Sequence, residues 1–203
     1  MKKLLKPVVI FMVGLMASSS ATSTFAQTAD TSVASANKTE NNPDPVFVFN
    51  RICYAQVHDL AAIRNMSSKL AWRSMQPEDL EQFKGKQALD ILDGWDVQVG
   101  ERLFRVGITK GAPAPSMAKT FPKLADGKVS TCSIVLDDQQ LASEFLPNMQ
   151  RLVGKEPVSA DVPEGLLRTT TWAGGNDELK VFVFAKAPPT GKGGLLNVTI
   201  LQK

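Results

Sequence analysis

Hydrophobic residues follow two different periods along this chain, and the change of period separates helical from extended segments. From residue 45 to residue 71 they recur every three or four positions, which predicts two helices joined at His58. Asp44-Pro45 suits the start of the first helix, because Asp caps free backbone N–H groups and Pro fits the first helical position. Asp59 is the expected cap of the second. A short third helix is predicted from Pro77 to about Phe83.

From Gly94 the hydrophobic period becomes two, which is typical of strands. Gly100-Glu101 interrupts the alternation with a two-residue turn, so residues 94–108 are expected to form a hairpin. A strand at 128–136 follows, and then a helix capped by Asp137-Asp138, kinked or divided at Pro147 and closed at Gly154. The last predicted elements are three strands, at residues 166–173, 178–187 and 195–202.

Short turns between these strands favour antiparallel pairing. We therefore expect an α+β fold, in which N-terminal helices pack on an antiparallel sheet built from a hairpin, a strand, a helix and a three-stranded meander. This fold is expected to form a single globular domain over residues 45–203.

The first 26 residues have the order of a secretory signal peptide. A positive start with Lys2, Lys3 and Lys6 precedes a short apolar core, and Thr24-Phe25-Ala26 is an acceptable cleavage site. Residues 27–44 are polar and are expected to form a disordered leader. The predicted mature protein begins at Gln27, is periplasmic or secreted, and has no stable membrane anchor, because the apolar core is too short to span a bilayer.

Removing that segment changes the charge. The whole chain has 23 Lys and Arg against 20 Asp and Glu, but three of the lysines belong to the signal peptide. The mature chain is therefore formally neutral, and no nucleic-acid partner is expected. Charges are nevertheless grouped along it, with an acidic stretch at 76–101 followed by a basic stretch at 102–132.

Two cysteines, Cys53 and Cys132, remain for crosslinking. Export favours a disulfide between them, because exported proteins fold where disulfides persist. Two buried free thiols and a catalytic thiol are the alternatives.

Sequence motifs for the common catalytic and cofactor sites are missing. His58 is the only histidine, and a loop position near a helix end explains it without catalysis. Asp90, Asp93 and Asp96 are spaced by three, yet Gly94 breaks the helix that would gather them, so a solvated acidic face is the preferred interpretation. We therefore predict no catalytic residue, no metal site and no cofactor.

The longest connection, residues 111–127, supplies the candidate binding site. It contains three prolines, and Met117, Lys119, Phe121 and Lys123 combine apolar groups with a positive rim. A loop that covers one end of the sheet is the alternative. The leading functional hypothesis is an exported, non-enzymatic protein that binds a protein or an envelope component. The alternative is a periplasmic or secreted hydrolase or isomerase that uses carboxylates or a Ser/Lys pair.

Overall fold

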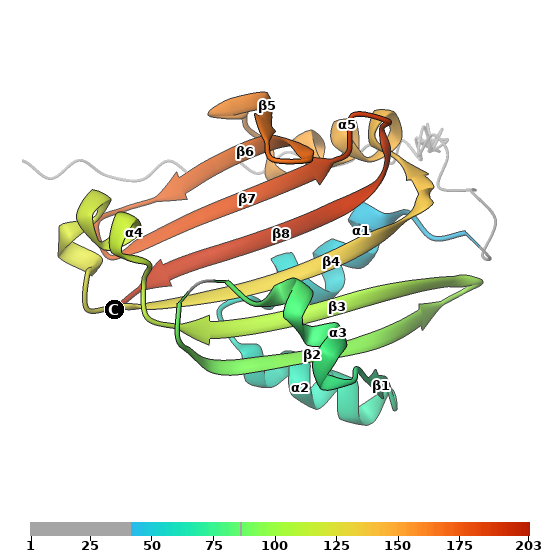
Figure 1. The fold of residues 1–203 in the computed structure, drawn as a ribbon, viewed down its shortest axis with the longest axis horizontal. Coiled ribbons are helices and arrows are strands. Elements are labelled where there is room, and N and C mark those ends of the chain that lie inside the picture. Colours follow the sequence, from blue (N-terminus) through green and yellow to red (C-terminus); the bar gives the residue numbers. More distant parts are fainter. Residues whose placement is uncertain (1–41, 86) are drawn as a thin grey trace, which may run out of the picture. The chain divides into compact units, whose positions relative to one another are not determined.

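One antiparallel sheet of eight strands organises the described part of the chain. The computed structural model describes residues 42–85 and 87–203, and these form the sheet in Figure 1. The strand order is β1-β2-β3-β4-β8-β7-β6-β5. In that order the strands are β1 (Arg73–Ser74), β2 (Leu89–Val99), β3 (Arg102–Gly111), β4 (Lys128–Leu141), β8 (Lys192–Gln202), β7 (Leu179–Ala187), β6 (Leu167–Gly175) and β5 (Ser159–Glu164).

The helical segments are short and are distributed along the chain. They are α1 (Pro45–Phe49), the π-helix η1 (Asn50–Tyr54), α2 (Leu60–Lys69), α3 (Pro77–Leu80), η2 (Glu81–Phe83), α4 (Pro115–Thr120), η3 (Pro122–Leu124) and α5 (Ala142–Val153). The predicted signal peptide and the predicted leader up to residue 41 lie outside the described residues.

The predicted fold, with N-terminal helices packed on a sheet that ends in a three-stranded meander, is wrong. The pairing of β4 with β8 joins the first and last groups of strands into one continuous sheet, and β5 extends the last group to four strands. Helical segments also lie between strands in the middle of the chain, as α3, α4 and α5 show. The local patterns indicated individual strands, but the long-range pairing that unites them leaves no mark in the periodicity.

The two faces of the sheet are covered differently. Neighbouring residues on a strand point to opposite faces, so Ile108 and Cys132 face the side of η1, whereas Gly107 and Ser133 face the other side. In Figure 1 α3 crosses in front of β2 and β3, while α1, α2 and α5 lie behind the sheet. The front face is thus only partly covered, mainly by the α3–η2 segment and by α4.

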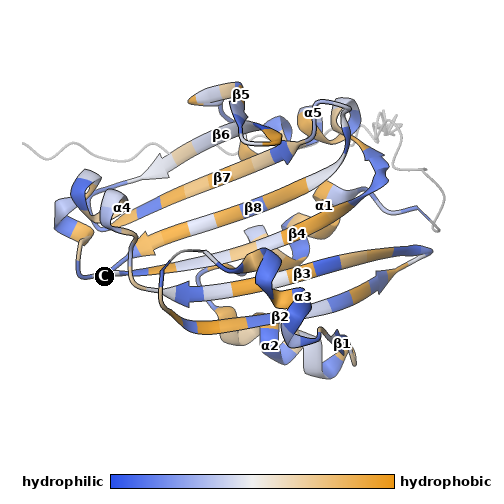
Figure 2. Cartoon of the chain, viewed as in Figure 1, coloured by the Kyte–Doolittle hydropathy of each residue, from blue (hydrophilic) through white to orange (hydrophobic). Residues whose placement is uncertain are grey.

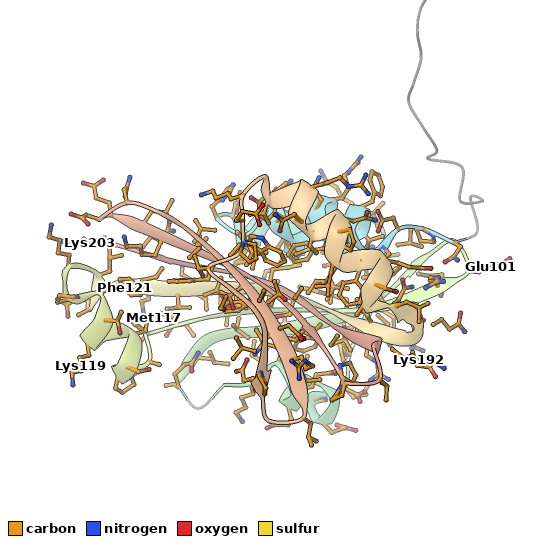
Figure 3. The ribbon with its side chains drawn as sticks, turned by 90° about the horizontal axis from the view of Figure 1, so that it is seen from above. Glu101, Met117, Lys119, Phe121, Lys192 and Lys203 are labelled. Atoms are coloured by element: carbon orange, nitrogen blue, oxygen red, sulfur yellow. A yellow bond between two sulfur atoms is a disulfide. The ribbon has the colours of Figure 1, made fainter. Side chains whose placement is uncertain are left out.

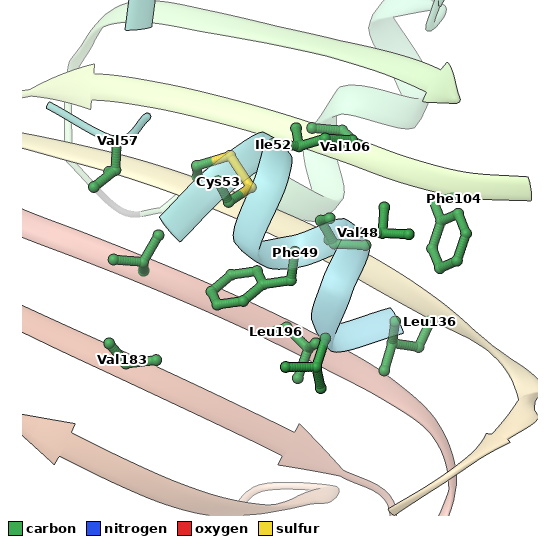
Figure 4. Close-up of a cluster of buried hydrophobic side chains, with 14 of the residues drawn as sticks. Val48, Phe49, Ile52, Cys53, Val57, Phe104, Val106, Leu136, Val183 and Leu196 are labelled. Atoms are coloured by element: carbon green, nitrogen blue, oxygen red, sulfur yellow. A yellow bond between two sulfur atoms is a disulfide. The ribbon is translucent and has the colours of Figure 1, made fainter. Parts of the chain in front are cut away.

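The main core lies between the sheet and the helices behind it. Phe49 and Cys53 are fully buried there, against Val106 of β3 and Leu196 of β8 (Figure 4). Figure 2 shows the hydrophobic residues running along β4, β8 and β7. Burial of these side chains is the main source of stability, at about 25 cal/mol per Å² of apolar area.

Several predicted element ends agree with the structure. Asp44 and Asp59 cap α1 and α2, accepting hydrogen bonds from the N–H groups of Val46 (2.9 Å) and Ala62 (3.2 Å). Gly154 ends α5 with a left-handed φ of 69°.

One other element prediction is wrong. Asp137-Asp138 lies within β4 and does not cap a helix, because the strand continues to Leu141 and α5 starts at Ala142. Of the two effects expected of Pro147, a kink or a division of the helix, division does not occur, since α5 runs from Ala142 to Val153 through it.

Candidate functional site

A cavity of about 870 Å³ opens between α1–η1, the end of α2 and the β2–β3 hairpin. Apolar side chains form most of its wall, among them Ile52, Met66, Trp72 and Val97. Its size is within the range of about 300–1,000 Å³ that is typical of small-molecule sites. It is the site in the described residues that is best suited to hold a ligand.

The rim of this cavity is unusually apolar for an exposed surface. Phe47, Leu70 and Leu103 line it and are 57%, 62% and 42% exposed. They come from α1, from the end of α2 and from β3, which are brought together only by the fold. Large hydrophobic groups gathered at the mouth of a cavity mark a binding surface more strongly than single exposed residues do.

Local structure explains why these side chains remain outside the core. On the short α1 helix, Val46, Val48 and Phe49 are buried, and Phe47 is left facing outward. At the end of α2 the chain reverses at Ala71, whose φ is 50°, and continues into β1. Leu70 therefore lies on the outside of a tight reversal.

The cavity also contains an exposed stretch of strand. β1 has only two residues and pairs with β2 at Trp95 and Asp96, so no strand covers the outer edge of β2 beyond them. Val97, Gln98 and Val99 in this uncovered stretch line the cavity. Polar backbone groups are therefore available beside the apolar wall.

Charged groups at the cavity are two arginines and one aspartate. Arg73 donates two hydrogen bonds to Asp96, at 2.5 and 3.1 Å, and Arg105 lies 4.0 Å from the same carboxylate. Arg51 lies over the ring of Phe47, with its guanidinium carbon 5.8 Å from the ring centre. The lining residues therefore carry a net formal charge of +1.

The candidate loop predicted from the sequence lies at the other end of β3. It follows Gly111, where β3 ends, whereas the cavity is beside Leu103, near the start of the strand. Figure 3 shows Met117, Lys119 and Phe121 at one end of the sheet near the C-terminal Lys203, and Glu101 at the opposite end.

Contacts hold this loop against the sheet. Phe121 packs on Phe182 of β7, with ring centres 5.7 Å apart, and Met117 joins it against a small core cluster around Leu124. Lys123 forms an ion pair of 2.6 Å with Asp177. These contacts suit a cover for the end of the sheet, and a role of Met117, Lys119, Phe121 and Lys123 in partner binding stays a prediction.

The three spaced aspartates lie on β2 and each has a separate basic partner. Lys128 pairs with Asp90, Arg64 with Asp93 and Arg73 with Asp96. Arg64 belongs to α2, Arg73 to β1 and Lys128 to the start of β4. Because these three bases come from different elements, the carboxylates paired with them do not converge on one point. Within the described residues, no group of three or more His, Cys, Asp or Glu side chains is arranged to hold a metal ion.

His58 is exposed in the turn between η1 and α2, where the sequence placed it. The cavity residues Phe47 and Arg51 were not predicted, although one signal was present. Phe47 is an aromatic residue off the buried stripe of its helix, a signal that indicates a site only when other exposed hydrophobic groups lie beside it.

Cys53 and Cys132 form a disulfide, as predicted, with Cα atoms 5.2 Å apart. The bond joins η1 to β4 in the middle of the sheet. It fits a protein that folds in an oxidising compartment. Among the described helices, none is long and apolar enough to cross a membrane.

Comparisons with protein families, with curated proteins and with solved structures find no match to this chain. The case for a function therefore depends on the geometry of the site.

Proposed function

We propose that this protein is an exported, non-enzymatic binding protein, and that its cavity holds the apolar part of an amphiphilic envelope component. The observation that carries the proposal is the cavity of about 870 Å³ with three large exposed hydrophobic residues at its rim. Leaving such residues in water is unfavourable, and an apolar ligand that covers them recovers about 25 cal/mol per Å² buried.

The disulfide supports the exported part of the proposal, since such bonds persist outside the cytosol. The alternative activity, a hydrolase or isomerase that uses carboxylates or a Ser/Lys pair, gains no support from the aspartates of β2. Each of them is engaged by its own base, whereas acid–base catalysis of that kind needs two groups directed at one bond.

Binding of Nile red, a neutral apolar dye, tests the proposal. The mature protein should bind the dye saturably with a rise in fluorescence. Leu70→Asp should weaken the affinity by about tenfold, because it places a charge in the apolar rim. Leu166→Asp is the matched control, since Leu166 is 88% exposed and lies in the β5–β6 turn, outside the cavity lining.

Absence of saturable binding, or equal binding by both variants, would contradict the proposal. Light scattering on the same samples measures the oligomeric state, and so tests whether a second copy of the protein covers the rim instead. A dimeric mature protein that Leu70→Asp converts to a monomer would identify the rim as an interface between copies and would overturn the proposed ligand site.

A further inference from the structure

Arg51 occupies a distinctive position at the mouth of the cavity. It belongs to the π-helix η1, where Ile52 and Cys53 are buried and Arg51 is exposed. Single π-helical turns are rare and are frequent at functional sites. Here the turn lets the same five residues anchor the disulfide inward and present a guanidinium group at the cavity.

The charge of Arg51 is not neutralised by a neighbouring acid. Within residues 42–85 and 87–203 it forms no ion pair, and its guanidinium group lies over the face of Phe47. Arg73, on the other side of the cavity, already donates two hydrogen bonds to Asp96. Among the residues that line the cavity, the positive charge in excess is therefore that of Arg51.

We infer that the ligand carries a single anionic group, a carboxylate or a phosphate, next to its apolar chain, and that Arg51 binds this group. The inference rests on the proposed function and adds the chemistry of the ligand's polar end. Arginine presents several N–H donors in one plane, which match the two oxygens of a carboxylate or phosphate. A neutral ligand would gain no such contact, and a cationic one would be repelled.

Two parts of the site would bind the two ends of the ligand, the apolar wall its hydrocarbon chain and the rim its anionic group. Ile52, Met66 and Leu70 offer a surface to a hydrocarbon chain, while Arg51 and Phe47 meet at the rim where the chain would end. The guanidinium carbon lies over the ring of Phe47, 5.8 Å from its centre, so the two side chains share the same part of the rim.

Calorimetric titration with four dodecyl compounds, each below its micelle concentration, tests the inference. Dodecanoate and dodecyl phosphate should bind more tightly than dodecanol, and dodecyltrimethylammonium most weakly. Arg51→Gln should lower the affinity for the two anions by about tenfold and leave that for dodecanol unchanged. Arg151→Gln, an exposed arginine on α5 outside the cavity, is the control and should bind as the wild type does.

The outcomes separate this inference from the proposed function. Equal affinity for all four compounds, with no effect of Arg51→Gln, would overturn the anionic group and leave the apolar site standing. Failure of all four to bind would contradict the proposed function itself. A preference between dodecanoate and dodecyl phosphate would identify which anionic group the site takes, and either preference supports the inference.

Discussion

Glu164 at the end of β5 is an acid whose surroundings favour its charged form. Lys186 donates a hydrogen bond of 2.8 Å to it, and Thr169 donates another of 2.8 Å. These hydrogen bonds, that of Lys186 first, lower the pKa of Glu164 below its ordinary value. The group therefore contributes stability above the unfolded pKa of about 4.3, and loses it as the pH falls through the folded pKa.

We expect Glu164→Gln to lower the free energy of unfolding at pH 7 by less than about 1 kcal/mol, because the carboxylate is largely exposed. At a pH below the folded pKa the difference from wild type should disappear. Urea unfolding at the two pH values measures this, with Glu156→Gln as an exposed control. A difference that stays constant with pH would exclude the ion pair as its cause.

Gly107 on β3 shows how close contact, and not flexibility, can require a glycine. The ring of Phe83 lies on the sheet at this point, and a Cβ on residue 107 would be 2.4 Å from the ring. Since the ring or the strand must shift to admit it, an added methyl group is expected to cost about 1–3 kcal/mol.

Gly107→Ala should therefore destabilise the protein by about 1–3 kcal/mol, and should cost much less when Phe83 is also replaced by Ala. The four proteins of this double-mutant cycle can be compared by chemical denaturation. An equal cost with and without Phe83 would show that the ring does not impose the glycine.

At the scale of elements, the two edges of the sheet are protected against further pairing. β1 is only two residues long, and β5 contains Pro163 and a register shift between Ser159 and Val162. Asp161 adds a positive φ of 56° in that irregular stretch. Proline has no backbone N–H to donate. The shortness of β1 and the irregularity of β5 therefore make both edges poor pairing partners for a strand of another chain.

Replacing Pro163 by Val should raise the tendency to self-associate, because it restores an N–H on an exposed edge strand beside the exposed Val162. The measurement is light scattering on heating. Pro157→Val, which lies before β5 outside any strand, is the comparison. Indistinguishable scattering of the two variants would show that Pro163 does not protect the edge.

Local sequence predicts elements well where the hydrophobic period is clear. It predicts them poorly where pairing with another strand imposes the extended structure. The β2–β3 hairpin follows from strict alternation around Gly100-Glu101, and it forms there. β5 was missed because Ser159–Glu164 contains Asp and Pro and is extended only by pairing with β6. β4 continues through Asp137-Asp138 to Leu141, although the two acids resemble a helix cap and the pairing with β8 is irregular between Leu136 and Leu141.

At the scale of the whole molecule, the disulfide fixes the helical layer to the centre of the sheet. Cys53 and Cys132 are 79 residues apart and fully buried. We expect no free thiol in the native protein, and replacement of both residues by Ala should lower the free energy of unfolding by about 2–4 kcal/mol. Thiol alkylation without reductant and urea unfolding of the variant check the two parts. Alkylation of both cysteines in the native protein would refute the bond.

The candidate site, the cavity beside the β2–β3 hairpin, was harder to predict from the sequence than the disulfide. When an exported chain has only two cysteines, each can pair only with the other within the chain, so the sequence alone predicts the disulfide. The cavity takes its wall from residues 47–52, 66–73 and 96–103, and only tertiary packing brings these segments together. The loop at 111–127 attracted attention because its composition is locally unusual, yet its aromatic group is used to pack on Phe182.

The pairing of β4 with β8 also sets the order of events during synthesis. Strands β1 to β4 and β5 to β8 each form from neighbours in sequence, but Thr131 meets Thr199 only after β8 has been made. Until then each half presents the long central edge that the finished sheet conceals, and contacts so distant in sequence form slowly. Truncation within Lys192–Gln202 should therefore leave the edge of β4 unpaired and promote aggregation, so β8 governs the yield of folded protein.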